Sequence, residues 1–205
     1  MKILVTGAKG FIGRNLIEEL KNRKYTDIYE FDIDTDIKLL DQYCFDCDFV
    51  FHLAGVNRPK DQDEFMKGNF GFTSILLDTL KKHHNKCPIM ISSSIQAELD
   101  NPYGLSKKAG EELIFKYGLE ENVKVFVYRF PNVYGKWCRP NYNSAIATFC
   151  NNIANDLPIT VNNRETIMHL VYIDDVFNEL INALEVKGNK IGNYYKVPTE
   201  DETSL

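Results

Sequence analysis

Two residues that could exchange a proton, Tyr103 and Lys107, stand four positions apart in a segment that we expect to be helical. Four-residue spacing on a helix places both side chains on one face, so the ammonium group can stand near the phenol. A nearby cation lowers the pKa of a tyrosine from its usual value of about 10, bringing proton exchange with a carbonyl or alcohol oxygen within reach at neutral pH. Alone, the same pair would also suit an aromatic anchor beside a solvated lysine.

A glycine-rich segment follows the first apolar run of the chain. Residues 7–13 form a GxxGxxG pattern that opens a predicted helix, and Asp32 ends the second predicted strand about twenty residues later. The glycines permit a tight turn and close backbone approach, so that amides at the helix start can bind a pyrophosphate, and the third glycine lets helix and strand pack closely. With strand, helix and acid in register, the segment predicts a dinucleotide-binding site.

The residues around this loop leave the choice of nicotinamide cofactor open. Asp32 could accept hydrogen bonds from both hydroxyls of an adenosine ribose and would repel a 2′-phosphate, which favours NAD. Lys9 lies inside the glycine loop, where its charge could reach a 2′-phosphate and so favour NADP. Arg14 and Lys38 are further candidates for that contact, and each of the three cations could equally be a solvated surface charge.

These residues need a scaffold, and the chain alternates apolar runs with helical patterns. The runs rich in β-branched and aromatic residues, which we expect to be strands, are Ile3 to Thr6, Ile28 to Phe31, Phe49 to Leu53, Ile89 to Ser92 and Val123 to Arg129. The expected helices are Phe11 to Leu20, Asp63 to His83 and Pro102 to Tyr117. Apolar runs without strict alternation fit strands buried on both faces, so we predict an α/β fold, a doubly wound parallel sheet of the Rossmann type.

Two local features refine this prediction. The helix that carries Tyr103 has Asn101 as a cap, Pro102 at its first position, and Gly118 to close it in the left-handed conformation. Between Asp32 and His52 the chain is too short for the usual strand, helix and strand, so we predict an abbreviated crossover there.

Size and composition restrict the class of protein. The 205 residues suit one domain with a substantial core, and a net charge of -5 gives no footprint for nucleic acid. The sequence shows no signal peptide and no membrane-spanning run, from which we predict a cytoplasmic protein. Five scattered cysteines make no disulfide framework, and the Cys44 and Cys47 pair lacks partners at metal spacing, so no metal site is expected.

Several sequence blocks occur together in one order. They are the glycine loop, His52 to Gly55 closing a strand, Asn69 in the following helix, Ser92 to Ser94 ending a strand, Tyr103 to Lys107, Arg129 to Gly135, and Met168 to Val176. In these blocks the chain resembles the extended short-chain dehydrogenase/reductase family, in its nucleotide-sugar branch, and the resemblance covers essentially the whole chain.

The resemblance implies roles for individual residues. Tyr103 would be the acid or base, Lys107 would also bind the nicotinamide ribose, and Ser94, with Ser93 as the fallback, would hydrogen-bond the substrate oxygen. Asn69 would be a structural residue. The cofactor-binding set would be Gly7, Lys9, Gly10, Phe11, Ile12, Gly13, Asp32, Leu53, Ala54, Gly55, Tyr103 and Lys107.

On the substrate side the resemblance is less complete. Many relatives carry an arginine and an aspartate at the start of the Met168 to Val176 block, where this chain has Met168 and His169, with Arg164 a few residues earlier. How a substrate diphosphate would be held is therefore left open. The expected substrate-binding residues are Arg58, Ser94, Asn132 and His169, although Arg58 would equally suit a solvated loop charge.

Three further features are the abbreviated segment after Asp32, the loop Ala54 to Pro59 with sequence AGVNRP, and the short interval between Ser94 and Tyr103. In these features the chain resembles, within the family, reductases that act in UDP-N-acetyl-L-fucosamine synthesis for capsular polysaccharide. This similarity implies an NADPH-dependent reduction of the C4 keto group of a UDP-2-acetamido-2,6-dideoxy-hexos-4-ulose, with NAD as the alternative cofactor. A nucleotide-sugar epimerase, or a dinucleotide-sensing module without catalysis, stays open as another function. The resemblance further implies a homodimer, a substrate lobe that is truncated here, and a carboxyl-terminal cupin domain beyond residues 1–205.

Overall fold

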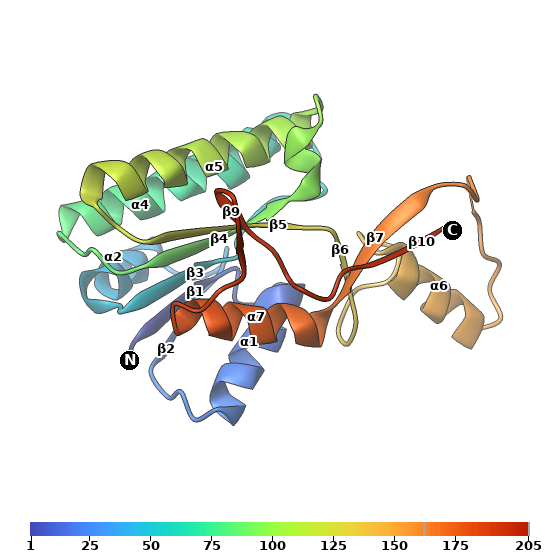
Figure 1. Ribbon diagram of the computed structural model, residues 1–205, viewed down its shortest axis with the longest axis horizontal. Helices are drawn as coiled ribbons and strands as arrows, with labels where there is room; N and C mark the ends of the chain where they lie inside the picture. The colour runs from blue at the N-terminus through green and yellow to red at the C-terminus, as the bar shows by residue number, and fades with distance from the viewer. Residues whose placement is uncertain (162, 205) are drawn as a thin grey trace.

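A seven-stranded sheet forms the centre of the computed structural model, which describes residues 1–161 and 163–204 (Figure 1). Its strand order is β2-β1-β3-β4-β5-β9-β8, and every pairing is parallel except that of β8 with β9. The strands are β1 (Ile3–Thr6), β2 (Ile28–Phe31), β3 (Phe49–His52), β4 (Ile89–Ser94), β5 (Val125–Phe130), β8 (Lys190–Ile191) and β9 (Tyr194–Tyr195). The predicted doubly wound sheet is confirmed.

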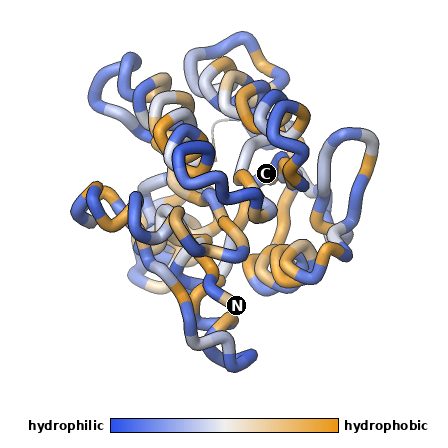
Figure 2. The backbone as a smooth tube through the Cα atoms, turned by 90° about the vertical axis from the view of Figure 1, so that its left-hand side faces the viewer, coloured by the Kyte–Doolittle hydropathy of each residue, from blue (hydrophilic) through white to orange (hydrophobic). Residues whose placement is uncertain are grey.

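Helices cover both faces of this sheet, as Figure 1 shows. One face is covered by α1 (Phe11–Asn22) and α7 (Ile173–Leu184), and the other by α2 (Ile37–Asp46), α4 (Phe72–Lys82) and α5 (Pro102–Glu121). Each face therefore has its own apolar core, with side chains of β1, β3 and β5 contributing to both. In Figure 2 the outward turns of the helices are coloured mainly hydrophilic, as helices packed on one side require.

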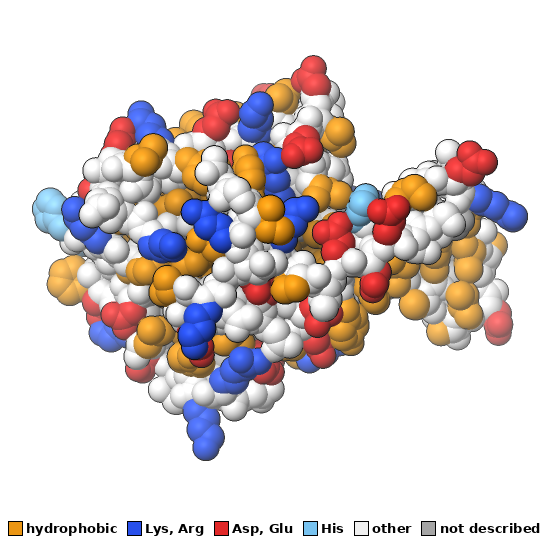
Figure 3. Space-filling view, viewed as in Figure 1, with side chains coloured by type: hydrophobic (Ala, Val, Ile, Leu, Met, Phe, Trp, Pro, Cys, Tyr) orange, Lys and Arg blue, Asp and Glu red, His pale blue; other side chains and the backbone are white. Residues whose placement is uncertain are grey.

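A smaller lobe extends from one end of the sheet (Figure 1). It has a three-stranded sheet of order β10-β7-β6 and one helix, α6. The bounds are β6 (Asn132–Tyr134), α6 (Ala145–Ala154), β7 (Ile167–Tyr172) and β10 (Asp201–Ser204). None of the α6 side chains is buried, and Figure 3 shows hydrophobic side chains gathered on the lobe where this helix lies.

The helix that carries Tyr103 is longer than predicted. Asn101 caps it by accepting a hydrogen bond from the Gly104 amide at 2.8 Å, as expected, but the helix runs through Gly118 to Glu121. Asn122 closes it instead, with φ of 55°. A Cβ on Gly118 would lie 2.9 Å from the Val125 side chain, so this glycine allows helix and strand to approach and does not end the helix.

The crossover after β2 is short, yet it holds a complete helix. Asp36 caps α2 by accepting a hydrogen bond from the Lys38 amide at 2.9 Å, and the helix then continues for ten residues to Asp46. The predicted abbreviated crossover is confirmed, but the expectation that a strand, a helix and a strand would not fit there is wrong. The crossover is short because the connections on either side of α2 are short.

The segment Asp63 to His83 is helical, as predicted, but it is not one regular helix. A single turn, α3 (Asp63–Phe65), leads into a π-helix, η1 (Met66–Gly71), and α4 continues from it. A second short element, the 3-10 helix η2 (Ile95–Glu98), connects β4 to α5. Single-turn π-helices of this kind are found frequently at functional sites.

Three of the five cysteines, Cys44, Cys47 and Cys87, are buried in the core under α2 and α4. The closest pair is Cys47 with Cys87, whose sulfur atoms lie 3.7 Å apart as thiols. In residues 1–161 and 163–204, no helix has both the length and the apolar character to cross a bilayer. The same residues contain no cluster of three or more side chains arranged to ligate a metal ion.

Candidate active site

The sheet order creates a crevice between β1 and β3. The chain leaves β1 toward β2 on one side and continues from β3 toward β4 on the other, so the connections at the carboxyl ends of β1 and β3 diverge. Ligands of doubly wound sheets bind at such a switch point. Here the turn after β1 begins with Gly7, at φ of +71°, and a Cβ on it would lie 2.6 Å from the Ala54 amide. Only glycine leaves the backbone room at this position.

The start of α1, after the turn that follows β1, has no side-chain cap. Its cap residue is Gly10, which has no side chain to satisfy the first amides of the helix. A Cβ on Gly13 would lie 2.2 Å from the Gly7 carbonyl oxygen, so the helix can approach the turn this closely only without one. Unsatisfied amides at a helix start, beside a backbone that is clear of side chains, fit the pyrophosphate of a nicotinamide dinucleotide.

Asp32 holds the glycine loop against the end of β2. Its two carboxylate oxygens accept hydrogen bonds from the amides of Lys9 and Ile33, at 2.7 and 2.8 Å. The Lys9 ammonium forms an ion pair with Asp34, and both side chains are largely exposed. Arg14 and Lys38 are the other candidates for contact with a 2′-phosphate. The Arg14 guanidinium carbon lies 5.2 Å from the Trp137 ring centroid, and Lys38 lies exposed at the start of α2.

The structure brings Tyr103 and Lys107 together in the first turns of α5. The Lys107 ammonium lies 5.8 Å from the Tyr103 ring centroid and donates a hydrogen bond to the Ser92 carbonyl oxygen at 3.1 Å. Burial lowers the pKa of Lys107 to about 8, against the opposing charge of Glu111. A neutral form of this lysine therefore becomes accessible just above physiological pH.

The expected lowering of the Tyr103 pKa by Lys107 is wrong for the chain alone. Burial raises the pKa of Tyr103, and only a hydrogen bond with the Ser94 side chain works in the opposite direction. Desolvation therefore outweighs the hydrogen bond with Ser94. A phenol with a raised pKa keeps its proton at neutral pH, which suits a proton donor.

Ser94 and Ser93 point to different partners. The Ser93 hydroxyl donates a hydrogen bond to the buried carboxylate of Glu111, behind the strand ends. Ser94 ends β4, accepts a hydrogen bond from the Gln96 amide at 3.2 Å, and is the serine that interacts with Tyr103. The fallback candidate, Ser93, is thus occupied by another contact, and Ser94 is the serine beside the phenol.

Asn69 fastens the loop after β3 to α5. Its side-chain oxygen accepts a hydrogen bond from the Val56 amide at 2.9 Å, and its side-chain nitrogen donates to the Val56 carbonyl and to the Ser106 hydroxyl, at 3.1 and 2.9 Å. A Cβ on Gly55 would lie 2.8 Å from Asn69 and 2.9 Å from the Lys107 ammonium. Asn69 therefore has the structural position that the sequence predicts.

His52 continues the same buried network. Its Nδ1 lies 2.7 Å from the Thr6 hydroxyl and its Nε2 lies 2.8 Å from the Thr73 hydroxyl, which itself donates to the Asn69 carbonyl oxygen. Because Thr73 uses its proton on that carbonyl, His52 donates through Nε2 and accepts at Nδ1. Burial lowers the pKa of His52 to about 3, so it is neutral.

Sequence reasoning missed a buried ion pair behind the site. Arg129 donates to both carboxylate oxygens of Glu111, at 2.8 and 2.7 Å, and its guanidinium carbon lies 3.9 Å from the Tyr194 ring centroid. Glu111 also receives the Ser93 hydroxyl, so the pair connects α5, β4 and β5. One signal was available, since Glu111 follows Lys107 by four residues and so shares its helix face.

The predicted substrate-binding residues lie on separate segments. Asn132, at the start of β6, donates a hydrogen bond to the His169 carbonyl oxygen at 3.1 Å, which joins β6 to β7. The His169 ring lies 3.0 Å from Glu200 and 3.9 Å from Glu202. Arg58 extends from the loop after β3, and its Nε donates to the side-chain oxygen of Asn143 at 3.1 Å.

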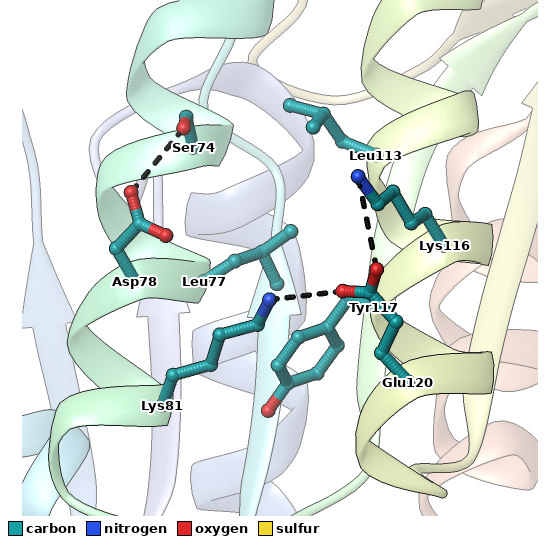
Figure 4. A pocket seen from close by; sticks show the side chains of 8 residues that line it. All are labelled: Ser74, Leu77, Asp78, Lys81, Leu113, Lys116, Tyr117 and Glu120. Atoms are coloured by element: carbon teal, nitrogen blue, oxygen red, sulfur yellow. Dashed lines mark hydrogen bonds and ion pairs between the residues drawn. The ribbon is translucent and has the colours of Figure 1, made fainter.

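A groove away from this site runs along α4 and α5. Figure 4 shows that Glu120 of α5 receives Lys81 from α4 and Lys116 from its own helix, at 3.2 and 3.7 Å. These residues belong to the carboxyl-terminal halves of the two helices, whereas Tyr103 lies at the start of α5. The groove carries none of the predicted site residues.

Known proteins are similar to this chain in both sequence and fold. The family described as NAD dependent epimerase/dehydratase matches residues 3–197. The chain is 46% identical to the UDP-2-acetamido-2,6-beta-L-arabino-hexul-4-ose reductase of Pseudomonas aeruginosa, over 100% of this chain and 54% of that protein. It is 25% identical to UDP-glucuronate 4-epimerase 1 of Arabidopsis thaliana, over 94% of this chain and 57% of that protein.

Two solved structures are similar over the full length of the chain. The capsular polysaccharide assembling protein CapF from Staphylococcus aureus has 43% identity and a TM-score of 0.90, with 56% of that chain covered. The UDP-glucuronic acid 4-epimerase from Bacillus cereus, in complex with NAD, has 25% identity and a TM-score of 0.85, with 80% of that chain covered. The chain spans about half the length of the curated relatives it matches.

Proposed function

Since the chain belongs to the NAD-dependent epimerase/dehydratase family, we propose that it reduces the C4 keto group of a UDP-2-acetamido-2,6-dideoxy-hexos-4-ulose. The product would be a precursor of UDP-N-acetyl-L-fucosamine for capsular polysaccharide. One observation carries this proposal: Tyr103, Lys107 and Ser94 meet at the strand ends, beside a loop that fits a dinucleotide. The likeness to the Pseudomonas aeruginosa reductase supports the substrate.

In this proposal a bound nicotinamide supplies the hydride that C4 receives. Tyr103 donates its proton to the oxygen that becomes negative as the carbonyl is reduced, and the raised pKa of Tyr103 means that the proton is present at neutral pH. Ser94 holds the same oxygen by a hydrogen bond. The Lys107 ammonium, fixed by the Ser92 carbonyl, stabilises the charge left on the phenol.

The cofactor we propose is NADPH, with NADH as the alternative. Lys9 is exposed and lies inside the glycine loop, so its ammonium could leave Asp34 for a 2′-phosphate. Asp32 and Asp34 favour NADH instead, because their charges oppose a second phosphate there. Calorimetric titrations with the two cofactors decide between them, and tighter binding of NADH would overturn NADPH.

A nucleotide-sugar epimerase is the second candidate, and the likeness to 4-epimerases supports it. An epimerase returns the hydride to the same sugar, so it consumes no reduced cofactor. A dinucleotide-sensing module without catalysis is less well supported, because it would have no use for Ser94, Tyr103 and Lys107 together. Dehydration is disfavoured, since Ile95 and Gln96 follow Ser94 where dehydratases carry acids.

The decisive experiment incubates the chain with NADPH and a panel of UDP-linked 4-keto sugars, and follows the absorbance of the reduced nicotinamide. We expect a stoichiometric loss with a UDP-2-acetamido-2,6-dideoxy-hexos-4-ulose. Interconversion of UDP-sugars without that loss would indicate an epimerase. Cofactor binding with neither reaction would indicate a sensing module.

We also propose a homodimer that pairs through α4 and α5. Both helices expose apolar side chains on their outer surface, with Ile75 50% and Leu119 86% exposed. Burial of such side chains stabilises association. Light scattering of the wild-type chain and of the Ile75→Glu and Leu119→Glu variants tests this, and a wild-type monomer at micromolar concentration would overturn it.

A further inference from the structure

Two arginines from separate loops share one aromatic ring at the edge of the proposed site. The guanidinium carbons of Arg58 and Arg139 lie 5.8 and 5.4 Å from the ring centroid of Tyr142. Arg58 follows β3, whereas Arg139 and Tyr142 belong to the loop between β6 and α6. Residues that are distant in the sequence thus concentrate positive charge at one place.

This charge has no partner of opposite sign in the part of the chain that the structure describes. No carboxylate there lies within ion-pair distance of either guanidinium, whereas Arg23 and Arg129 both have one. The only hydrogen bond that the described residues provide is that of Arg58 Nε with Asn143, at 3.1 Å. Both arginines are exposed, so their remaining donors are available to an anion from solution.

Arg58 is held close to the predicted proton-transfer residues. Val56, two residues before it, is fixed by Asn69 through two hydrogen bonds. Gly55, three residues before it, passes so near Lys107 that a Cβ would lie 2.9 Å from the ammonium. Three residues of extended chain span at most about 11 Å, which limits how far the backbone of Arg58 can lie from that of Gly55 beside the lysine.

Arg139 is held by the loop that follows β6. The Asn141 amide donates to the Thr148 hydroxyl of α6 at 2.9 Å, and Ser144 caps the same helix by accepting from the Ala147 amide at 3.2 Å. The loop therefore has a fixed end beside Tyr142. Because Asn143 bonds to Arg58, the loops after β3 and after β6 meet in a defined arrangement.

We propose that Arg58 and Arg139 form a clamp for the diphosphate of the nucleotide-sugar substrate, an assignment that rests on the proposed function. A diphosphate carries two anionic groups, and two planar guanidinium groups match phosphate oxygens through paired hydrogen bonds. The diphosphate is joined to C1 of the sugar, across the ring from C4, which agrees with a clamp at the rim of the site and Tyr103 further in.

The alternative location near His169 is less suited to a diphosphate. Glu200 and Glu202 stand beside that histidine and would repel phosphate oxygens. The pyrophosphate of the cofactor is a second possible ligand for the arginines, since its chemistry is the same. Its place is at the start of α1, where the glycine loop leaves backbone amides open.

Calorimetric titration with UDP tests the clamp without any turnover. We expect the wild-type chain to bind UDP and the Arg58→Gln and Arg139→Gln variants each to bind it about tenfold or more weakly. Uridine affinity and NADPH affinity should stay within about twofold of wild type. Two controls, Arg23→Gln on the exposed end of α1 and Arg164→Gln in the lobe, should bind UDP normally.

Each contrary result overturns the clamp. These are no measurable UDP binding by the wild-type chain, unchanged UDP affinity in both variants, a loss confined to Arg164→Gln, or an equal loss of UDP and NADPH affinity. Thermal melting shows that the variants are folded, and Arg58→Lys and Arg139→Lys keep the charge where the glutamine variants do not fold.

The outcome is separable from that of the proposed function. If UDP binding depends on both arginines but no UDP-linked 4-keto sugar oxidises NADPH, the clamp stands and the reductase activity fails. If the wild-type chain turns over the keto sugar while both variants bind UDP normally, the activity stands and the clamp fails.

Discussion

Asn69 donates a hydrogen bond to the hydroxyl of Ser106, the residue that precedes Lys107, at 2.9 Å. The same side chain holds the amide and the carbonyl of Val56, so one buried amide group sets the distance between α5 and the loop after β3. The Lys107 ammonium and the backbone of Gly55 face each other across this connection. The geometry of the proposed site thus depends on a residue without a chemical role in the reaction.

Replacing Asn69 should therefore damage both stability and activity. Asn69→Ala leaves the Val56 amide and carbonyl without partners, and unpaired buried groups of this kind cost about 1–3 kcal/mol each, so we expect unfolding to become easier by about 2–4 kcal/mol. Urea denaturation measures this. The control is Asn57→Ala, an exposed asparagine of the same loop, which should change the free energy of unfolding by less than about 0.5 kcal/mol. Equal effects of the two variants would contradict the role of Asn69.

Tyr103→Phe should remove the proton donor and leave the fold in place. We expect the rate of NADPH oxidation with the keto sugar to fall at least about 100-fold, since a positioned acid contributes this much or more. Cofactor affinity by calorimetry should stay near wild type. Tyr43→Phe, which removes the hydroxyl of a tyrosine stacked on Tyr29 away from the site, is the matched control. Near-normal turnover by Tyr103→Phe would rule out the proposed role.

Lys107 should lower the stability of the fold at neutral pH. Its pKa is about 8 in the folded chain and 10.5 as the ordinary value, so below pH 8 both states bind the proton and the folded state bears the full cost of burying the charge. Stability should rise as the pH increases from 8 to 10.5, where the unfolded state binds more protons. At pH 7, we expect the free energy of unfolding of Lys107→Met to exceed that of the wild-type chain by up to about 3 kcal/mol.

The gain in stability of the Lys107→Met variant should disappear near pH 10.5, the ordinary pKa of lysine. The same variant should also lose activity. Chemical denaturation at several pH values measures the first, and cofactor oxidation the second. Lys108→Met, at the neighbouring exposed position, is the control and should show no such pH dependence. For the wild-type chain, the rate of keto-sugar reduction should also fall as the pH rises through about 8, because Lys107 then loses its charge. A flat profile across that range would argue against a charged Lys107 in the reaction.

The low pKa of the buried His52 predicts that the fold loses stability in acid. Its pKa is about 3 in the folded chain against an ordinary value of 6.5, so between these limits the unfolded state binds a proton that the folded state does not. Stability should fall as the pH drops through this window, by about 1.4 kcal/mol per pH unit from this residue alone. Urea denaturation at about pH 7, 6, 5 and 4 measures how the free energy of unfolding changes with pH.

The matched variants are His52→Gln and His84→Asn. His52→Gln should be less stable at pH 7, because its contacts with Thr6 and Thr73 change, but its stability should depend less on pH below 6.5. His84 is exposed with φ of 51°, which asparagine tolerates, so His84→Asn should keep the wild-type slope. If both variants keep that slope, His52 is not its source.

The sheet, the glycine loop and the Tyr103 and Lys107 pair could be predicted from the sequence because each depends on a local pattern. Residues four apart on a helix share a face whatever the rest of the chain does. The prediction that Gly118 ends the helix was wrong, because glycine is equally consistent with a helix end and with close packing. Its neighbour in space, Val125, shows that the role here is close packing.

Long-range contacts explain the other differences. The pKa of Tyr103 follows from burial, which depends on side chains such as Phe65, whose ring centroid lies 5.6 Å from that of Tyr103. The pair of Glu111 with Arg129, and the ring of Tyr142 between two arginines, join segments that no sequence spacing relates. The short crossover held a full helix because Asp36 starts it directly.

The π-helix η1 sets the phase of everything that follows it. Its hydrogen bonds span one residue more than those of an α-helix, and one residue corresponds to a rotation of about 100°. That offset lets Asn69 face Val56 and Ser106 while the leucines of α4, Leu76, Leu77 and Leu80, still face the core. A deletion of one residue between Met66 and Gly71 would restore an α-helix and turn Asn69 away, so the chain can lose its site geometry here without losing a single helical turn.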